Sequence, residues 1–296
     1  MKSLASKLLP KSLKDKITGS DLFTRRQARA LAASSKRIDI CSAQFAHILH
    51  LAKHPPLEGK ICLEVGAGWV LTHALVCYLL GAQKVIATDI THRAHPEVLT
   101  TAVSEAVDSI PRDILAPFSN HAEIRERFDR LTSIRHYSFE ELANIGIEYS
   151  AGIDLARTIS TERVDFIYSF SVLEHVPVAD VRNLLENLVA SLNPGGTMLH
   201  CIHLEDHRDF DRNSLDFLGI ASDRYTRELE TNWGNRIRMS EWEKVFENLA
   251  GTRTELIYTY LRADVPLPTA IDPSIKYRDE IDLRTSHLGV YTRKSK

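Results

Sequence analysis

Long apolar runs are absent from this sequence of 296 residues, and no stretch approaches the roughly 18 or more apolar residues of a membrane span. Internal repeats and low-complexity tracts are also absent. Hydrophobic residues make up 44% of the chain and charged residues 26%, as in ordinary soluble proteins, which argues against a disordered chain. The length allows one large domain with extensions or two small domains.

Cysteine is scarce, and the cysteines that occur stand singly. They are Cys41, Cys62, Cys77 and Cys201. Because no CxxC pair is present, the sequence offers neither a disulfide framework nor a cysteine zinc site. The apolar surroundings of the four residues predict buried thiols in a reducing compartment, so we expect a cytoplasmic protein.

Net charge is also small, at -2, which argues against a protein that coats nucleic acid with its whole surface. Residues 1–37 nevertheless hold ten lysines and arginines and only two aspartates. We expect residues 1–56 to form a basic helical extension, whose leucines either pack on the body or give residues 1–37 peripheral contact with an anionic membrane. No nucleic-acid-binding module or series of stacking aromatics accompanies this arm, so we expect no nucleic-acid partner.

A strand, a glycine turn, a helix and a second strand follow one another within thirty residues. Residues 60–65 form a short apolar run that ends in glycines, which is typical of a buried strand. Residues 69–80 have the length and composition of a helix closed by Gly81, and residues 84–89 repeat the strand pattern with an acid at the end. This order predicts a βαβ unit.

The alternation continues to the C-terminus, although residues 110–145 have the weakest pattern. Further strands are predicted at 147–150, 164–169, 197–203, 254–260 and 288–292, and helices at 22–53, 98–109, 121–131, 178–192 and 240–249. Repeated βα units imply a mainly parallel sheet with helices on both faces.

The turn at residues 66–68 marks the expected ligand site, because ligands of such sheets lie across the carboxyl ends of the strands. Gly66 and Gly68 allow a ligand to approach the backbone, and Asp89 can accept hydrogen bonds from both hydroxyls of a ribose. The alternative is a tight turn between strand and helix with no ligand. A nicotinamide site would need a third glycine and room for a diphosphate, where this chain has Trp69. Glu64 before the turn favours a cationic ligand, such as the sulfonium and ammonium groups of S-adenosylmethionine.

From about residue 60 to 202 the chain resembles the class I S-adenosylmethionine-dependent methyltransferases. The matching segments are EVGAG at 64–68, ATD at 87–89, VDFIYSFSVLEHV at 164–176 and LNPGGT at 192–197. Val70 stands where many members have a third glycine, and the Gly-Trp pair resembles a bacterial branch. The resemblance implies a Rossmann-like three-layer α/β sandwich over residues 57–296, with a seven-stranded, mostly parallel sheet and an antiparallel last strand.

The motifs and the resemblance together assign the cofactor contacts. The predicted contacts with S-adenosylmethionine are Glu64, Gly66, Ala67, Gly68, Trp69, Asp89, Ile90, Asp154, Ser169 and Phe170. Asp154 is preferred for the adenine because it lies a short distance before the fourth strand, and Glu140 is the rival.

Catalytic candidates follow the fourth and fifth strands at the same edge of the sheet. They are His175, His203, Asp206 and His207, with Asp206 orienting His207 as a possible general base. The alternatives are a capping or packing role for His175 and a solvated polar loop for residues 203–207. No metal site is assigned, because alternating residues in a loop (His203, Glu205, His207) are a weak ligand pattern.

The segment from residue 203 to 238 resembles bacterial methyltransferases that occur beside glycan-assembly enzymes. It would make residues 204–238 a cover on the acceptor side. Arginines of this cover either grip an anionic acceptor or pair with nearby acids: Arg208, Arg212, Arg236 and Arg238. We predict methyl transfer to an oxygen or nitrogen of a small molecule or glycan precursor. Methylation of RNA or protein, and a non-catalytic cofactor-binding module, are the alternatives.

Overall fold

The computed structural model of the protein describes residues 21–33, 37–53, 55–106, 109–208 and 212–296. Most of the basic arm, and with it the predicted membrane contact, therefore lies outside the described residues. Within these ranges no helix is both long enough and apolar enough to cross a membrane.

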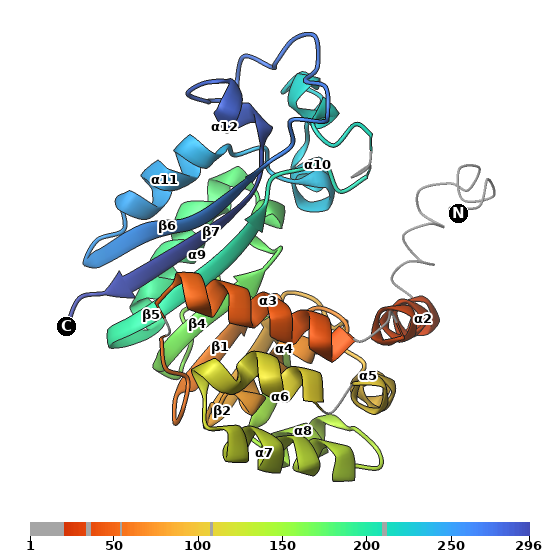
Figure 1. The fold of residues 1–296 in the computed structure, drawn as a ribbon. Coiled ribbons are helices and arrows are strands. Elements are labelled where there is room, and N and C mark those ends of the chain that lie inside the picture. The colour runs from red at the N-terminus through yellow and green to blue at the C-terminus, as the bar shows by residue number, and fades with distance from the viewer. Residues whose placement is uncertain (1–20, 34–36, 54, 107–108, 209–211) are drawn as a thin grey trace.

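A seven-stranded sheet forms the centre of the described chain (Figure 1). Its strands are β1 (Ile61–Val65), β2 (Lys84–Asp89), β3 (Ile147–Ala151), β4 (Val164–Phe170), β5 (Leu192–His203), β6 (Thr252–Leu261) and β7 (Thr285–Lys294). The order is β3-β2-β1-β4-β5-β7-β6. Neighbours from β3 to β5 are parallel, and β7 is antiparallel to both β5 and β6. This topology confirms the predicted sandwich with an antiparallel last strand.

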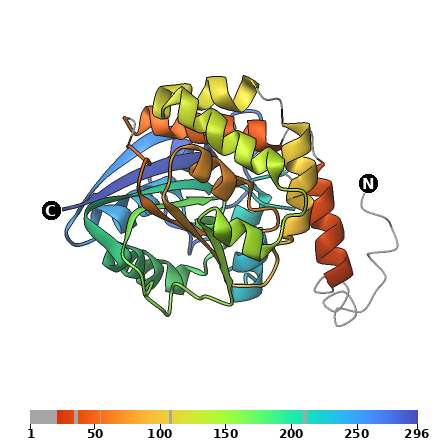
Figure 2. The same ribbon diagram turned by 90° about the horizontal axis from the view of Figure 1, so that it is seen from below.

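Helices cover both faces of the sheet. They are α2 (Asp21–Ala32), α3 (Arg37–Leu51), α4 (Thr72–Leu79), α5 (Leu99–Glu105), α6 (Ser109–Leu115), α7 (His121–Ser133), α8 (Phe139–Asn144), α9 (Val178–Ser191), α10 (Arg227–Trp233), α11 (Met239–Glu247) and α12 (Glu280–Arg284). One hydrophobic cluster joins α3, α4, α6 and α7 to one face, and a second joins α9 and α11 to the other. Figures 1 and 2 show these two layers on either side of the strands.

Hydrophobic patterning explains which helix lies where. Nearly every residue of α4 is buried, because the helix is enclosed by the sheet, α3 and α7. In α9 the buried leucines and valine recur at three- and four-residue spacing, so only one side faces the sheet. Each fully buried side chain of this kind contributes roughly 1.5–3 kcal/mol.

Three helix predictions differ from the structure. Residues 22–53, expected as one helix, correspond to the two helices α2 and α3. The helix expected from Trp69 begins at Thr72, because the Trp69 carbonyl accepts the backbone N–H of His95 and Leu71 adopts a left-handed φ of 57°. Residues 98–109, expected as one helix, are divided between α5 and α6. The strand and helix boundaries elsewhere lie within a few residues of those predicted, apart from β5, which already begins at Leu192.

Two segments lie beyond the carboxyl ends of β5 and β6 and form a small subdomain above the sheet in Figure 1. Residues 204–238 contain α10, and residues 262–284 contain α12. A third hydrophobic cluster holds them together, formed by Leu215, Phe217, Leu218, Tyr225, Val265 and Leu283. The subdomain therefore lies at the same sheet edge as the predicted ligand site.

Candidate active site

A cavity of about 710 Å³ opens at the carboxyl ends of β1, β2 and β4. Its walls come from the loops after these strands, from α10 and from the N-terminal helices. Cavities of about 300–1,000 Å³ typically bind small molecules, so this volume can hold a nucleoside cofactor. Eight of the predicted cofactor residues line it: Gly66, Ala67, Gly68, Trp69, Asp89, Ile90, Asp154 and Phe170.

The glycine turn after β1 needs glycine for two separate reasons. Gly66 and Gly68 have φ values of +73° and +68°, in the left-handed region that side chains rarely adopt. At Gly66 a Cβ atom would also lie 2.6 Å from a Val172 methyl group. The backbone of the turn is therefore exposed to the cavity without side chains that would fill it.

Asp89 joins this turn to the end of β2. One carboxylate oxygen accepts the Gly68 backbone N–H at 3.0 Å, and the other accepts the Thr91 backbone N–H and hydroxyl at 2.9 and 3.1 Å. A carboxylate has about four lone-pair sites, so acceptor capacity remains for the hydroxyls of a ribose. Asp89 is thus both a structural link of the turn and a candidate ribose ligand.

Asp154 lies on the cavity wall after β3, and Glu140 does not. The Asp154 carboxylate accepts the backbone N–H of Ala156 at 3.0 Å, and Ile90 and Ile153 lie on the same wall. An apolar surface with one acid at its edge suits a flat base with an amino group.

Glu64 and Ser169, the other two predicted cofactor contacts, lie beneath the cavity and are not among its lining residues. Glu64 accepts a hydrogen bond from the Tyr168 hydroxyl at 3.3 Å, and the Ser169 hydroxyl pairs with His200 Nδ1 at 2.8 Å. Burial raises the pKa of Glu64 to about 8. The hydrogen bond from Tyr168 lowers this pKa by less, and the nearby charge of Asp89 adds to the rise. Glu64 is therefore protonated at neutral pH in this state.

The N-terminal helices supply a wall that the sequence motifs did not indicate. Leu31 and Arg37 line the cavity, and Arg37 Nε is buried without a hydrogen-bond partner among the described residues. From α3, the ring of Phe45 meets the ring of Phe170 edge-on at 5.1 Å. On the other side His73 stacks on Phe170 at 4.1 Å. The N-terminal helices and the sheet thus share one site.

His175 lines the cavity in a short turn, Leu173–His175, that follows β4. Its Nδ1 lies 2.7 Å from the Thr231 carbonyl oxygen of α10, so Nδ1 carries the proton and Nε2 is left as an acceptor. Burial lowers the pKa of His175 against this hydrogen bond. The imidazole is therefore neutral near pH 7.

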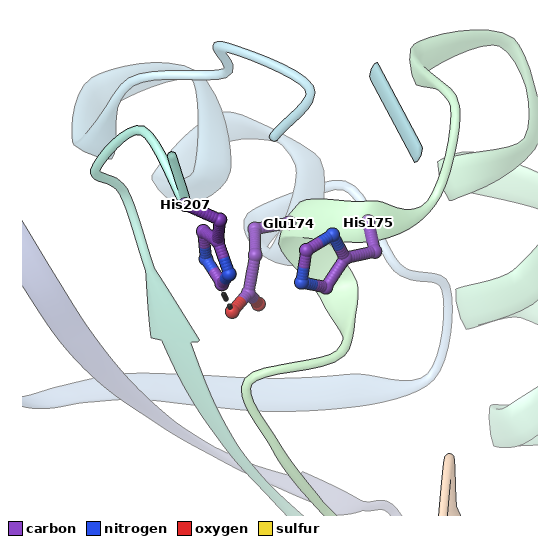
Figure 3. Close-up of side chains that lie close together, drawn as sticks. All are labelled: Glu174, His175 and His207. Atoms are coloured by element: carbon purple, nitrogen blue, oxygen red, sulfur yellow. Dashed lines mark ion pairs between the residues drawn. The ribbon is translucent and has the colours of Figure 1, made fainter. Parts of the chain in front are cut away.

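Glu174 and His207 lie beside His175, from the ends of β4 and β5 (Figure 3). His207 Nε2 is 3.7 Å from a Glu174 oxygen, and its ring meets that of His175 at 4.3 Å. Burial raises the pKa of Glu174 to about 8, while donors that include the Ser171 side chain lower it by less. Burial and the neighbouring histidines lower the pKa of His207 to about 3.

His203 and Asp206 have other partners. His203 Nε2 pairs with Glu205 at 2.9 Å and its ring stacks on His287 at 4.1 Å. The Asp206 carboxylate accepts hydrogen bonds from Arg208, whose guanidinium also lies over the Trp233 ring at 3.5 Å. The expected orientation of His207 by Asp206 is therefore corrected: Glu174 is the carboxylate turned toward His207.

Two cover arginines, expected either to grip an acceptor or to pair with nearby acids, bind backbone carbonyls instead. Arg238 is fully buried and donates to the carbonyls of Leu204, Leu283 and Thr285. Arg236 is mostly buried, stacks on a tyrosine and donates to backbone carbonyls of the cover. Neither guanidinium is available to an anionic acceptor.

Asn235, which no sequence motif singled out by itself, fixes the turn that carries His175. Its side chain donates to the carbonyls of Leu173 and Val176, both at 2.9 Å, and its backbone N–H donates to Glu174 at 2.7 Å. The cover therefore holds the catalytic candidates in place. A lone asparagine in a polar segment gives no signal of such a role.

A Rossmann-like sheet in this order, with a glycine turn and an acid after the second strand at one cavity, is the arrangement that the resemblance to S-adenosylmethionine-dependent methyltransferases predicts. The profile of a family described as methyltransferase domain matches residues 35–255, so the chain belongs to that family. The family uses S-adenosylmethionine, and the protein is an enzyme with this cofactor. The backbone left open by Gly66 and the free acceptor capacity of Asp89 fit the cofactor.

Solved structures of low sequence identity are similar to the chain. A putative S-adenosylmethionine-dependent methyltransferase from Listeria monocytogenes is 13% identical, with a TM-score of 0.44, over 85% of this chain and 98% of that one. One from Mesorhizobium loti is 18% identical, with a TM-score of 0.44, over 84% and 98%. Magnesium protoporphyrin IX methyltransferase from Synechocystis, with the cofactor bound, is 12% identical, with a TM-score of 0.44, over 96% of each chain. No curated sequence matches the chain.

Proposed function

We propose that this enzyme transfers the methyl group to an oxygen or nitrogen atom of a small molecule or glycan precursor. The observation that carries the proposal is the place of His175, whose neutral imidazole lines the cofactor cavity. Glu174 and His207 accompany it at the ends of the two strands that border the cavity and the cover (Figure 3).

S-adenosylmethionine supplies a methyl group on a positively charged sulfur. Positioning supplies much of the acceleration of such an in-line displacement, and a hydroxyl or protonated amine must in addition lose a proton. His175 and His207 are our candidates for activating the acceptor, since neutral imidazoles can take up a proton or bind a cation. His203 and Asp206 act in this proposal through neighbours, by holding Glu205 and Arg208.

A hydroxyl-rich acceptor suits the cover. Arg227, Thr231 and Asn232 of α10 line the cavity and offer charged, hydroxyl and amide groups. This is the segment whose sequence resembles glycan-associated methyltransferases, which supports a glycan precursor as acceptor. Peripheral contact with a membrane through residues 1–37 stays part of the proposal and is tested by vesicle co-sedimentation.

The test begins with calorimetry of S-adenosylmethionine and S-adenosylhomocysteine binding. Gly66→Ala should abolish binding, because a methyl group there meets Val172. Gly251→Ala is the matched control: its φ of +70° imposes the same backbone strain, but the added carbon would meet nothing within 4 Å. Equal loss of binding in both variants would assign the effect to instability.

The acceptor is then sought with labelled cofactor. Panels of sugar phosphates, nucleotide sugars, small alcohols and amines are compared with total RNA and a protein extract. Label in a small molecule, on oxygen or nitrogen by mass spectrometry, supports the proposal. Label confined to RNA or protein would refute the proposed acceptor class while leaving the methyltransferase activity intact.

A further inference from the structure

We infer that Glu174, His175 and His207 form a binding site for one divalent transition-metal ion beside the cofactor cavity, whose wall His175 lines. Each residue offers one ligand atom, and these atoms all lie within 4.8 Å of one another. Figure 3 shows the Glu174 carboxylate between the two imidazole rings. The existence of the site is independent of the proposed function, and its role in the reaction rests on that function.

Glu174 gives the strongest indication of a missing partner. The residue is 1% exposed, and no donor among the described residues meets either carboxylate oxygen with normal hydrogen-bond geometry, although the Ser171 side chain and the His203 backbone lie near enough to lower the pKa that burial raises. Buried polar atoms are nearly always paired, and an exception often marks an unoccupied ion or water position. The Glu174 carboxylate points toward the imidazoles of His175 and His207, and His207 Nε2 lies 3.7 Å from one of its oxygens.

His175 is oriented as a metal-binding histidine usually is. Such residues donate one ring N–H to a backbone carbonyl or carboxylate, which fixes the ring and leaves the other nitrogen to the metal. The bond from Nδ1 of His175 to the Thr231 carbonyl, at 2.7 Å, has this form. Asn235 in turn holds the backbone on both sides of Glu174. The ligands are therefore fixed by partners of their own.

Two histidines and one carboxylate are the ligand set of many catalytic zinc sites and of non-haem iron sites, which keep a position open for water or substrate. Magnesium and calcium prefer oxygen ligands and suit this set poorly. Zinc bonds of about 2.0–2.1 Å place tetrahedral ligand atoms roughly 3.3 Å apart. The observed 3.7 Å between Glu174 and His207 needs a small side-chain adjustment, and the other pairs, which lie within 4.8 Å, need up to about 1.5 Å.

A second cluster, formed by His203, Glu205 and His287, meets the same distance criterion but is less suited. Arg262 donates to one Glu205 oxygen at 2.7 Å, and His203 pairs with the other at 2.9 Å. The carboxylate charge is thus already compensated by a cation. This cluster serves as an internal control for the test.

A metal ion at this site would activate the acceptor without a free general base. The acceptor hydroxyl takes the open ligand position and releases its proton to water, because coordination lowers its pKa. Its oxygen then forms a bond to the methyl carbon while the carbon–sulfur bond breaks and the electron pair remains on sulfur. The charge of the ion is unchanged through the step.

The test is direct metal binding by the full chain, stripped with chelator and dialysed. Zn²⁺ is titrated by calorimetry, and Co²⁺ is added as a probe whose visible absorption reports tetrahedral nitrogen and oxygen ligands. We expect one equivalent, and losses in Glu174→Gln, His175→Ala and His207→Ala beyond the roughly 10–100-fold seen when an outer hydrogen-bond partner is removed. His287→Ala should keep wild-type affinity. Thermal unfolding of each variant checks that it is folded.

Retained affinity in Glu174→Gln, or loss only in His287→Ala, would overturn the assignment, as would weak binding that no variant changes. Glu174→Gln keeps the size of the side chain, so misfolding is not expected to obscure its result. The role in the reaction is measured separately, as methyl transfer before and after chelation. Transfer at an undiminished rate in metal-free protein would overturn that role and leave the proposed function standing. Absence of any small-molecule acceptor, with zinc bound, would refute the proposed function alone.

Discussion

Beneath the glycine turn, the Glu64 side chain is enclosed by groups from three elements. Tyr168 of β4 donates to it, His73 Nδ1 of α4 is 4.0 Å away, and Asp89 of β2 adds a like charge. The Cys77 thiol is also close enough to sense the Glu64 charge. The pKa of Glu64 therefore depends on its burial, on Tyr168 and on the cofactor-site residue Asp89.

Replacement of Glu64 by glutamine should change how stability depends on pH. The folded pKa of about 8 lies above the ordinary value of 4.5, so the folded state holds a proton that the unfolded state has released. Stability should therefore fall as pH rises from 4.5 to 8 and level off above it, by an amount on the order of a few kcal/mol. Glu64→Gln removes the part of this loss that Glu64 causes, while Glu174, whose pKa is also raised to about 8, keeps its own part. Urea unfolding at pH 5 and pH 8 measures it.

The exposed Glu247→Gln serves as the control for this experiment, because it makes the same chemical change on the outside of α11. It should leave the wild-type difference between pH 5 and pH 8 unchanged. If Glu64→Gln showed that same wild-type difference, Glu64 would be ionised in the folded protein, and the buried carboxylic acid assigned above would be wrong.

The position of a residue at the cavity was predictable where backbone conformation or strand position determines it. Gly66, Gly68 and Asp89 line the cavity because a turn at the end of a strand has few alternatives. The sequence did not show that the Glu64 side chain lies in the layer under the cavity, and its contact with the cofactor stays a prediction. Glu174 was not among the predicted site residues, because its contact with His207, 33 positions away in sequence, is visible only in the structure.

At the scale of elements, one buried guanidinium helps to fasten the cover to the sheet. Arg238, at the start of α11, donates to Leu204 after β5, Leu283 in α12 and Thr285 at the start of β7. Its pKa falls to about 10 through burial, opposed by the charges of Asp282 and Glu205. The group therefore remains charged at neutral pH and joins three segments far apart in sequence.

Arg238→Met should destabilise the fold by about 2–5 kcal/mol, because the variant keeps the apolar stem and leaves buried carbonyls without donors. Thermal or urea unfolding measures the loss. Arg224→Ala, on the exposed surface of the same cover, should stay within about 0.5 kcal/mol of wild type. An equal effect of the two substitutions would show that Arg238 does not fasten the cover.

Elements were predicted well where a buried strand runs between glycine turns, as at residues 84–89. The region of α6 to α8 was the least predictable, because its helices are short and only one side of α7 is buried. That residues 204–238 cover the acceptor side stays a prediction, whereas the burial of Arg236 and Arg238 within them was not predicted at all. A charged residue in a sequence is normally expected at the surface. Only the packed structure shows that the Arg238 guanidinium is buried and donates to backbone carbonyls of three segments.

In the whole molecule, the N-terminal helices belong to the cofactor site as well as to the core. Phe45 of α3 lies in the main hydrophobic cluster, and α2 is attached by Thr24 to His95 and by Arg25 to Glu97. Leu31 and Arg37 then reach the cavity wall. The cofactor therefore has contacts available on the sheet side and on the helical side, and should tie the two together.

Hydrogen exchange can test this link. Saturating S-adenosylhomocysteine should slow early exchange in α2 and in the first turns of α3, together with residues 66–73, because a ligand that contacts both sides suppresses their separate opening. Helix α7, which packs on α4 away from the cavity, should be unchanged at the same times. Early exchange reports local opening. Late exchange of core amides requires global unfolding, and any ligand slows it because binding stabilises the whole fold, by about 2.7 kcal/mol at a hundredfold excess over Kd. Protection confined to residues 66–73 would mean that the helices cover the cavity without responding to its ligand, and protection equal in α7 would mean that no local link exists.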